Sequence, residues 1–367
     1  MADTTVAAGL KVKQWDDQFF TEVARDNRFA GEFGTQMTSL IQVKENLMKK
    51  PGDRVVFALA NRLTNEAVTG SDWLEGNEEQ QTFRSFEVTV NKRRNATQVA
   101  EIDEQYSAIS IRDAGKFALK EWAVEDTENL VIRGMNSING VRHSSASEAQ
   151  KDAWLLDNTD RVLFGAARTN HSTNDHSTSL ANCDTTADKF SAAALSKMKT
   201  IAETIANPRI RPVRSTVAKN GRKYFICYAH PYAFDDLKAD STITQAQREV
   251  MLQMENERLF EGGDLYWDGI IIKKIEQAST EWNYGLVGAA SANVVGAFLC
   301  GAQAFGAAYA RRWNTVTQER DYEDKRGVAV SAIYGIEKMK FGSGTADTAD
   351  LKDHGVCSGY FATSGLT

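Results

Sequence analysis

The chain has 367 residues, enough for one large domain or for two to three smaller ones with cores of their own. Apolar residues make up 42% and charged residues 25%, as in globular proteins, and the net charge of −6 argues against a protein that binds nucleic acid through its overall charge. Four scattered cysteines without a CxxC pair are expected to be reduced thiols in a cytosolic setting, and the apolar run at 294–310 is too short to cross a bilayer.

The N-terminal part is predicted to be an arm that leads into an extended β-excursion. Residues 1–35 mix aromatic and charged side chains without a clear helical period, so they are expected to pack on another surface. A short helix is predicted at 38–50, ended by Pro51-Gly52. Apolar residues then alternate with polar ones in two predicted strands, one with Val55, Phe57 and Leu59, the other with Phe86, Val88 and Val90.

A polar stretch without basic residues, 64–83, separates these two strands. Its acidic residues include Glu75, Glu78 and Glu79. The basic run Lys92-Arg93-Arg94 after the second strand is predicted to form a turn, and a third strand is expected from Thr97 to Asp103. Because a two- or three-stranded arm with so few apolar residues cannot support itself in water, it is expected to lie on another surface.

Helix signals dominate the middle of the chain. Apolar residues at three-to-four spacing predict a long helix from Asp113 to Met135. Ser147 and Gln150 form a capping-box pattern ahead of a second helix. A third apolar stripe runs from Phe190 to Ile205, with Thr185 and Asp188 as its expected start and Asn207-Pro208 as its end.

The last part is predicted to be a scaffold of strands. Tyr224–Ala229 and Ile270–Glu276 are apolar runs typical of buried strands, and a polar helix is expected between them at 244–260. The Gly/Ala-rich segment 294–310 lies before a further strand-like run, Val328–Tyr334, and is expected to allow close backbone approach. No acid, base or nucleophile in this region has a spacing that suggests catalysis.

The order of these elements resembles that of the major capsid proteins of tailed bacteriophages, in the podovirus-type branch with short, scaffold-free chains. The resemblance includes Tyr-Phe-Ile-Cys-Tyr-Ala-His-Pro-Tyr-Ala-Phe-Asp-Asp-Leu at 224–237 and Gly-Gly-Asp-Leu-Tyr-Trp-Asp-Gly-Ile-Ile-Ile at 262–272. It implies an α+β fold of the Hong-Kong-ninety-seven type (the Johnson fold). The implied parts are an N-terminal arm at 1–51, an extended β-hairpin E-loop at 52–111, a P-domain with a long spine helix at 112–223, an A-domain at 224–330, and a return to the P-domain at 331–367.

The function implied by this resemblance is self-assembly through pentamers and hexamers into an icosahedral shell around a double-stranded DNA genome. Such a protein would be found in the virion after assembly in the bacterial host cytoplasm. Its expected partners are further copies of itself, the portal, decoration or scaffolding proteins, and packaged DNA bound without sequence specificity. No cofactor, membrane or enzymatic activity is expected. An encapsulin-like bacterial compartment shell shares the fold and stays open as an alternative.

Two sets of charged residues are candidate contact sites. One set joins a basic run to an acidic limb on the same extended element, which suits contacts between unlike patches of neighbouring copies. The alternative interpretation is that these charges only keep the surface soluble. Its members are Lys92, Arg93, Arg94, Glu75, Glu78 and Glu79. The second set is a basic face that could neutralise phosphates of packaged DNA, although a solvated or intersubunit face is the preferred interpretation. Its members are Arg209, Arg211, Arg214, Arg222 and Lys223.

A metal-dependent enzyme is the alternative from another class of protein. It would use His171, Asp175 and His176, three residues of types that can bind zinc. Their spacing suits no regular face, and no cluster of Cys or Glu accompanies them, so no metal site is expected. The sequence contains no P-loop, dinucleotide-binding glycine pattern, HExxH or GxSxG, and no catalytic residues are proposed.

Overall fold

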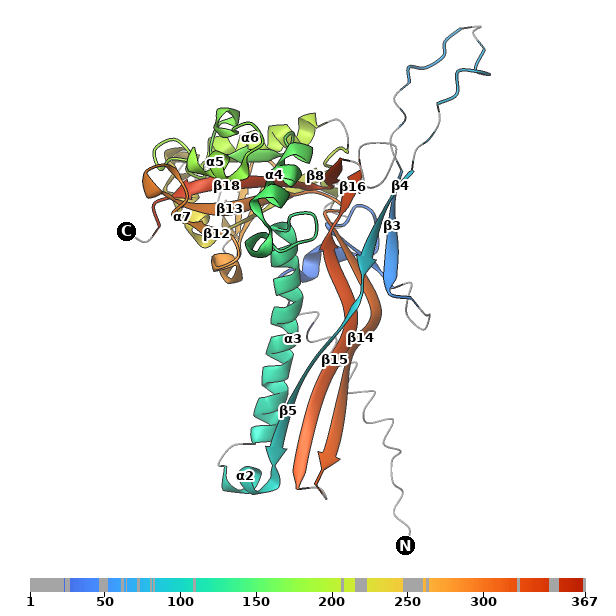
Figure 1. Ribbon diagram of the computed structural model, residues 1–367, viewed down its shortest axis with the longest axis vertical. Coiled ribbons are helices and arrows are strands. Elements are labelled where there is room, and N and C mark those ends of the chain that lie inside the picture. Colours follow the sequence, from blue (N-terminus) through green and yellow to red (C-terminus); the bar gives the residue numbers. More distant parts are fainter. Residues whose placement is uncertain are drawn as a thin grey trace. The chain divides into compact units, whose positions relative to one another are not determined.

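A computed structural model describes residues 23–365 of the chain (Figure 1). The description omits residues 24–26, 46–51, 61–62, 64, 71–72, 80, 82, 108–109, 206–207, 215–222, 247–259, 262–263, 322–323 and 343–349. The chain divides into two compact units, each made of segments that are distant in sequence. Unit 1 comprises residues 1–55, 88–134 and 305–337, and unit 2 comprises residues 56–87, 135–304 and 338–367.

Unit 1 is a five-stranded sheet with a long helix beside it (Figure 1). The strand order is β1 (Phe33–Gly34), β2 (Ile41–Lys44), β14 (Phe305–Arg320), β15 (Lys325–Lys338) and β5 (Asn91–Ala100). The short helices η1 (Ala30–Glu32) and α2 (Glu101–Tyr106) and the long helix α3 (Ile111–Met135) complete it. Aromatic rings join helix and sheet, since Trp122 of α3 meets Trp313 of β14 edge-on at a centroid distance of 5.8 Å.

Unit 2 is built on a large mixed sheet. Its strands run in the order β6 (Val162–Phe164), β18 (Val356–Thr363), β13 (Asn293–Cys300), β8 (Lys223–Ala229), β11 (Ile270–Lys274), β10 (Asp264–Trp267) and β9 (Phe260–Glu261). Strand β12 (Asn283–Gly285) pairs with β13, and β7 (Val213–Arg214) pairs with β8. The small sheet β16 (Lys340–Gly342) with β17 (Leu351–Asp353) and the arm strands β3 (Arg54–Ala60) and β4 (Phe83–Thr89) form separate ladders.

Helices pack on the large sheet through two buried clusters. Helices α6 (Ala192–Thr204) and α7 (Pro231–Ala239) share one cluster with Val295, Ala297 and Leu299 of β13. Helices α4 (Glu148–Asp157) and α5 (His176–Ala181) share the other with Val294. Because neighbouring residues of a strand point to opposite faces, β13 has helices on both sides. Further short helices include η2 (His143–Ser145), η3 (Arg168–Asn170), η4 (Glu276–Ser279) and η5 (Ala289–Ser291).

Local sequence signals explain where the helices of unit 2 begin. Ser147 caps α4 in a reciprocal capping box with Gln150, as predicted. Helix α7 begins with Pro231, and the Nδ1 atom of His230 accepts a hydrogen bond from the backbone N–H of Tyr232 at 3.2 Å. Helix α6 is capped by Ser191, so the predicted start near Thr185 and Asp188 is wrong.

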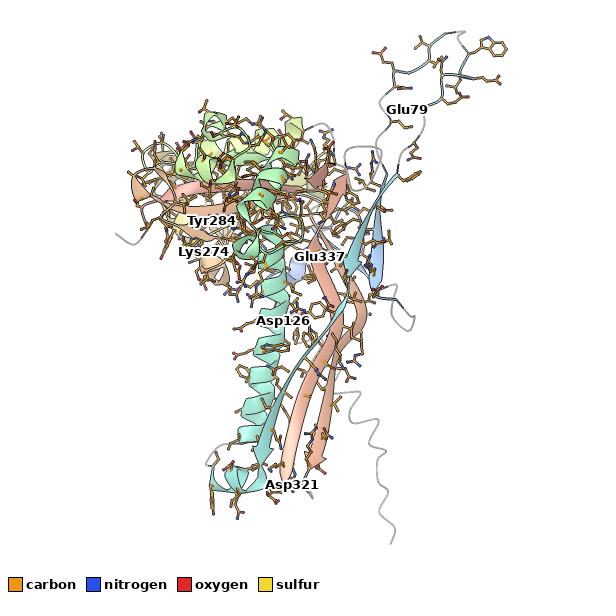
Figure 2. All side chains as sticks on the ribbon, in the orientation of Figure 1. Glu79, Asp126, Lys274, Tyr284, Asp321 and Glu337 are labelled. Atoms are coloured by element: carbon orange, nitrogen blue, oxygen red, sulfur yellow. The ribbon has the colours of Figure 1, made fainter. Side chains whose placement is uncertain are left out.

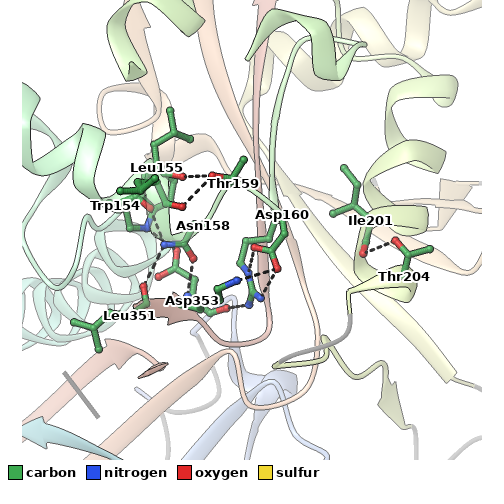
Figure 3. Close-up of polar contacts among 12 residues, drawn as sticks. Trp154, Leu155, Asn158, Thr159, Asp160, Ile201, Thr204, Leu351 and Asp353 are labelled. Atoms are coloured by element: carbon green, nitrogen blue, oxygen red, sulfur yellow. Dashed lines mark hydrogen bonds and ion pairs between the residues drawn. The ribbon is translucent and has the colours of Figure 1, made fainter. Parts of the chain in front are cut away.

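A polar network pins α4 to β17 inside unit 2 (Figure 3). The side chain of Asn158 donates to the carbonyl oxygen of Trp154 at 2.9 Å and accepts from the backbone N–H of Asp353 at 2.8 Å. The carboxylate of Asp353 accepts from the indole N–H of Trp154 at 3.1 Å and from Lys338 Nζ at 2.6 Å. Lys338 and Asp353 are both almost completely buried, and Lys338 also donates to the carbonyl oxygen of Ser137. A buried charge pair with this many bonds specifies one arrangement of the elements that it joins.

Several sequence predictions are confirmed by the structure. The long helix is α3, the buried strand at 224–229 is β8, and the run at 270–276 contains β11. The alternating residues of the two arm strands, Val55, Phe57, Leu59, Phe86, Val88 and Val90, are all buried. The predicted domain boundary at 223/224 is a separate matter: β6, from the segment assigned to the P-domain, and β8, largely from the segment assigned to the A-domain, belong to one sheet.

Other predictions are wrong where long-range pairing decides the local structure. Residues 41–44 of the helix predicted at 38–50 form β2, because this segment pairs in parallel with β14. The basic run at 92–94 lies inside β5, not in a turn. The third predicted strand, 97–103, ends at Ala100, where α2 begins. Of the helix predicted at 244–260, residues 247–259 lie outside the described residues.

The segment at 294–310 is two strands, β13 and the start of β14, joined by a tight connection. We expect Gly301→Val to destabilise the protein, because a Cβ atom there would lie 2.3 Å from the carbonyl oxygen of Arg211 and 2.9 Å from a methyl group of Ile210. Ala304→Leu should act similarly, since Ala304 is fully buried. Thermal unfolding should show a loss of about 1–3 kcal/mol for each variant. Gly31→Val, at a position with no atom within 4 Å of the added Cβ, is the control. Melting like the parent in all three variants would contradict this prediction.

Candidate intersubunit interface

Strand β5 divides the basic run between the two faces of its sheet. Its antiparallel register with β15 pairs Lys92 with Ile333, Arg93 with Ala332 and Arg94 with Ser331. Because side chains alternate along a strand, Lys92 and Arg94 share one face and Arg93 lies on the other. Lys92 and Arg94 are exposed, whereas Arg93 is half-buried.

Arg93 is bound within its own subunit. Its guanidinium donates to Oδ1 of Asp126 on α3 at 2.5 Å, and the hydroxyl of Tyr334 on β15 donates to Oδ2 of the same carboxylate at 2.8 Å. Figure 2 labels Asp126 on α3. Burial, followed by the negative charge of Asp126, raises the pKa of Tyr334 well above its ordinary value, so the phenol stays a donor. Lys92 and Arg94 are therefore the members of the run that are exposed on the other face of the sheet.

The acidic residues lie in the excursion between β3 and β4, where hydrogen bonds within the excursion order the chain. Glu78 accepts from the backbone N–H of Gly76 at 2.7 Å, and Glu79, labelled in Figure 2, accepts from that of Asn65 at 2.8 Å. The backbone N–H of Asn77 donates to the carbonyl oxygen of Leu74 at 3.0 Å, which closes a turn. Glu75 and Glu78 are exposed, and Glu79 is half-buried.

The same turn presents two apolar side chains that the sequence reasoning did not single out. Trp73 is 77% exposed and Leu74 is 65% exposed. The sequence did contain a signal for them, because a tryptophan and a leucine stand out in an otherwise polar stretch. We therefore add both residues to the candidate interface.

The basic face predicted at 209–223 is described in part. Arg209 and Arg211 are exposed on either side of buried Ile210, and Lys223 is exposed at the start of β8. Arg214 belongs to β7, but its side chain lies outside the described residues, as does the whole of Arg222. Three of the five residues thus offer positive charge at the surface of unit 2.

The residues of the alternative metal site serve as a helix cap and as core. Both carboxylate oxygens of Asp175 accept from Thr178, from its N–H at 2.9 Å and from its hydroxyl at 2.8 Å, so Asp175 caps α5. His176 is fully buried, with its ring 5.3 Å from that of Tyr360 and 5.3 Å from that of His143. His171 packs against Phe164 instead. Across the described residues, His, Cys, Asp and Glu form no group of three or more that could hold a metal ion.

The four cysteines are free and buried, as reduced thiols would be. Burial raises the pKa of both Cys183 and Cys357 to about 12, so these thiols stay protonated at neutral pH. In the part of the chain that the structure describes, no helix is long and apolar enough to cross a membrane.

The buried histidines couple the stability of unit 2 to acid. Burial lowers the pKa of His143 to about 3 and that of His176 to about 4, both below the ordinary value of 6.5. In acid the unfolded chain therefore binds more protons than the folded chain does. The contribution of the neutral buried histidines to the free energy of unfolding is complete above about pH 6.5 and is lost as the pH falls toward 4.

His176→Phe should remove part of this dependence and keep an aromatic ring among the rings that surround it. We expect the melting temperature of the variant to fall less steeply than that of the parent between pH 6.5 and pH 4. His176→Gln tests whether loss of the ionisable group alone has this effect. Parallel pH profiles for all three proteins would contradict the coupling.

Comparison with known proteins shows that the chain is similar to phage capsid proteins. A family model described as phage capsid protein matches residues 3–363. The major capsid protein of Pseudomonas phage KPP25 is 27% identical over 375 residues, which cover 95% of this chain and 94% of the relative. The solved capsid asymmetric unit of cyanophage Pam1 is 27% identical and superposes with a TM-score of 0.79 over 100% of both chains. The capsid of Ralstonia phage GP4, at 20% identity, has a TM-score of 0.73 over 93% of this chain and 92% of that chain.

Proposed function

The chain belongs to the phage capsid protein family, and we propose that it is a major capsid protein that assembles through pentamers and hexamers into an icosahedral shell around double-stranded DNA. The observation that carries this proposal is the likeness to the Pam1 capsid subunit over the full length of both chains. The α+β capsid fold expected from the sequence is confirmed by this likeness. An encapsulin-like compartment is less well supported, because the matching family model describes phage capsids.

The parts of the chain have distinct roles in this proposal. Helix α3 is the spine of the P-domain, the excursion between β3 and β4 is the E-loop, and strands of the large sheet contribute to the A-domain. Copies contact one another through many modest interfaces that act together, so none needs to be tight alone. The portal and any decoration or scaffolding proteins are further partners, and assembly takes place in the host cytoplasm. Catalysis has no part in the proposal.

We propose that the basic face of unit 2 binds one of two partners. Arg209, Arg211 and Lys223 can neutralise phosphates of packaged DNA without reading its sequence. An adjacent subunit with acidic groups could occupy the same residues. The preferred partner is the adjacent subunit, since the chain as a whole is acidic.

Assembly of the purified protein tests the proposed function. The protein expressed alone should sediment as large particles, and electron microscopy should show closed shells. A protein that stays monomeric over a wide range of concentration and ionic strength would contradict the proposal.

Because Arg93 and Arg94 lie on opposite faces of their sheet, substitutions at these two positions should have opposite effects on subunit stability and on assembly. Lys92→Glu with Arg94→Glu should leave melting of the subunit nearly unchanged, because exposed ion pairs contribute about 0–1 kcal/mol. The same variant should lose closed particles, since the change is repeated at every contact. Arg93→Ala should instead destabilise the subunit by about 1–3 kcal/mol, because it leaves Asp126 without a charged donor. Normal shells from the double variant would remove Lys92 and Arg94 from assembly.

A further inference from the structure

The histidines of the chain are unevenly distributed over unit 2. Its large sheet carries one buried cluster with α6 and α7 and another with α4 and α5. Four of the five histidines lie on the side of α4 and α5. Each of these four has a buried ring nitrogen without a hydrogen-bond partner among the described residues. They are His143, His171, His176 and His354.

His176 and His143 lie at the centre of this group. The ring of His176 lies 5.3 Å from that of Tyr360, 5.8 Å from that of Phe164 and 6.3 Å from that of Trp154, and these three residues belong to the α4–α5 cluster. The ring of His143 lies 5.3 Å from that of His176. Both ring nitrogens of His176 lack a partner, so two imidazoles share a space that is lined by aromatic rings.

The other two histidines are attached to the same layer. The ring of His171 lies 6.0 Å from that of Phe164. His354 is almost completely buried and follows Asp353, whose carboxylate accepts the indole N–H of Trp154 on α4. Buried polar groups are normally hydrogen-bonded, so four exceptions in one layer are unusual.

The fifth histidine differs in both respects. His230 stands at the start of α7, which packs in the α6–α7 cluster. Its Nδ1 atom accepts from the backbone N–H of Tyr232 at 3.2 Å, and its Nε2 atom lies 3.3 Å from the carbonyl oxygen of Ser279. Both nitrogens of this ring therefore have partners.

A proton taken up in the α4–α5 layer would create a charge with neither water nor an acceptor beside it. Burial accordingly lowers the pKa of His143 and of His354 to about 3 and that of His176 to about 4. Charges of both signs face these rings, and the cations among them oppose protonation further. The titratable and charged groups around the four histidines are Glu148, Lys151, Asp152, Arg161, Arg168, Asp175, Arg211, Tyr284, Lys338 and Tyr360.

We propose that acid opens the layer of η2, α4 and α5 while the sheet strands β8 and β13 stay folded with α6 and α7. Opening this layer alone admits water to the buried histidines and leaves the α6–α7 cluster intact. Proteins open locally where the local free-energy cost is low, and η2 and α5 contain only three and six residues. Unit 2 thus unfolds in two steps in acid. This behaviour belongs to the single subunit and does not depend on the proposed shell.

Hydrogen exchange read by mass spectrometry, in steps from pH 7 to pH 4, tests the order of opening. Protection, taken relative to an unstructured peptide at the same pH, should fall first in peptides from 143–157 and 176–181. Peptides from 192–204 and 223–239 should lose protection only at lower pH. Between pH 7 and pH 5 one histidine with its pKa lowered from 6.5 to about 4 should favour opening by about 20-fold. Loss of protection in both layers at the same pH would overturn the proposal.

Substitutions identify the groups that respond to acid. His176→Phe keeps an aromatic ring in the cluster, and over the same pH interval its α4 and α5 peptides should lose about 20-fold less protection than those of the parent. His143→Phe should act in the same direction. His230→Asn is the matched control, because asparagine can still cap α7 and the layer should open at the parent pH. A His176→Phe profile equal to that of the parent, or a shifted profile in His230→Asn, would overturn the proposal. If a phenylalanine variant is unprotected at pH 7, the order of opening in the parent decides.

Discussion

The carboxylate of Asp126 accepts hydrogen bonds from two different strands while it stands on the long helix α3. One oxygen binds the guanidinium of Arg93 and the other binds the phenol of Tyr334. The side chains of Arg93 and Asp126 are 30% and 15% exposed, so this charge-assisted bond is stronger than a similar bond between fully exposed groups. Because side chains alternate along β5, fixing Arg93 toward the helix fixes Lys92 and Arg94 on the other face. The internal contact therefore determines the charge that unit 1 presents to other molecules.

Unit 2 depends on a comparable carboxylate. Asp353 is bound by Lys338 and Trp154, and its backbone N–H is held by Asn158. Removing one partner of a buried ion pair is costly because it leaves an uncompensated buried charge. In both units, alternative arrangements that break such a pair are therefore much less stable than the observed one. Four of the candidate interface residues, Lys92, Arg94, Glu75 and Glu78, have the opposite character, because they are exposed. Ion pairs between exposed residues contribute only about 0–1 kcal/mol each. Under the proposed function, weak contacts that are repeated many times can hold a shell together although none of them is tight alone.

The most accurate predictions from the sequence concerned features that depend on residues close together in the chain. The period of α3, the capping box at Ser147 and the alternation along β3 and β4 are local signals, and the structure contains all of them. The basic run failed as a prediction because Arg93 meets Asp126 across 33 positions and β5 pairs with a strand more than two hundred residues away. Residues 41–44 failed for the same reason, since their partner is β14. The charge of the excursion can be read from the sequence, whereas the exposure of Trp73 is seen only in the structure.

Strand β5 is the last strand of its sheet among the described residues. Such a strand offers a ready edge for pairing with another chain, and ten residues of it could join two subunits in an unproductive way. If two copies of β5 met in antiparallel fashion near Arg93, Lys92 and Arg94 of both copies would bring four positive charges together, because Arg93 is paired with Asp126. The repulsion between these charges disfavours the pairing of two β5 edges. The charge of Lys92 and Arg94 on this strand thus opposes the pairing of the β5 backbone of one copy with that of another.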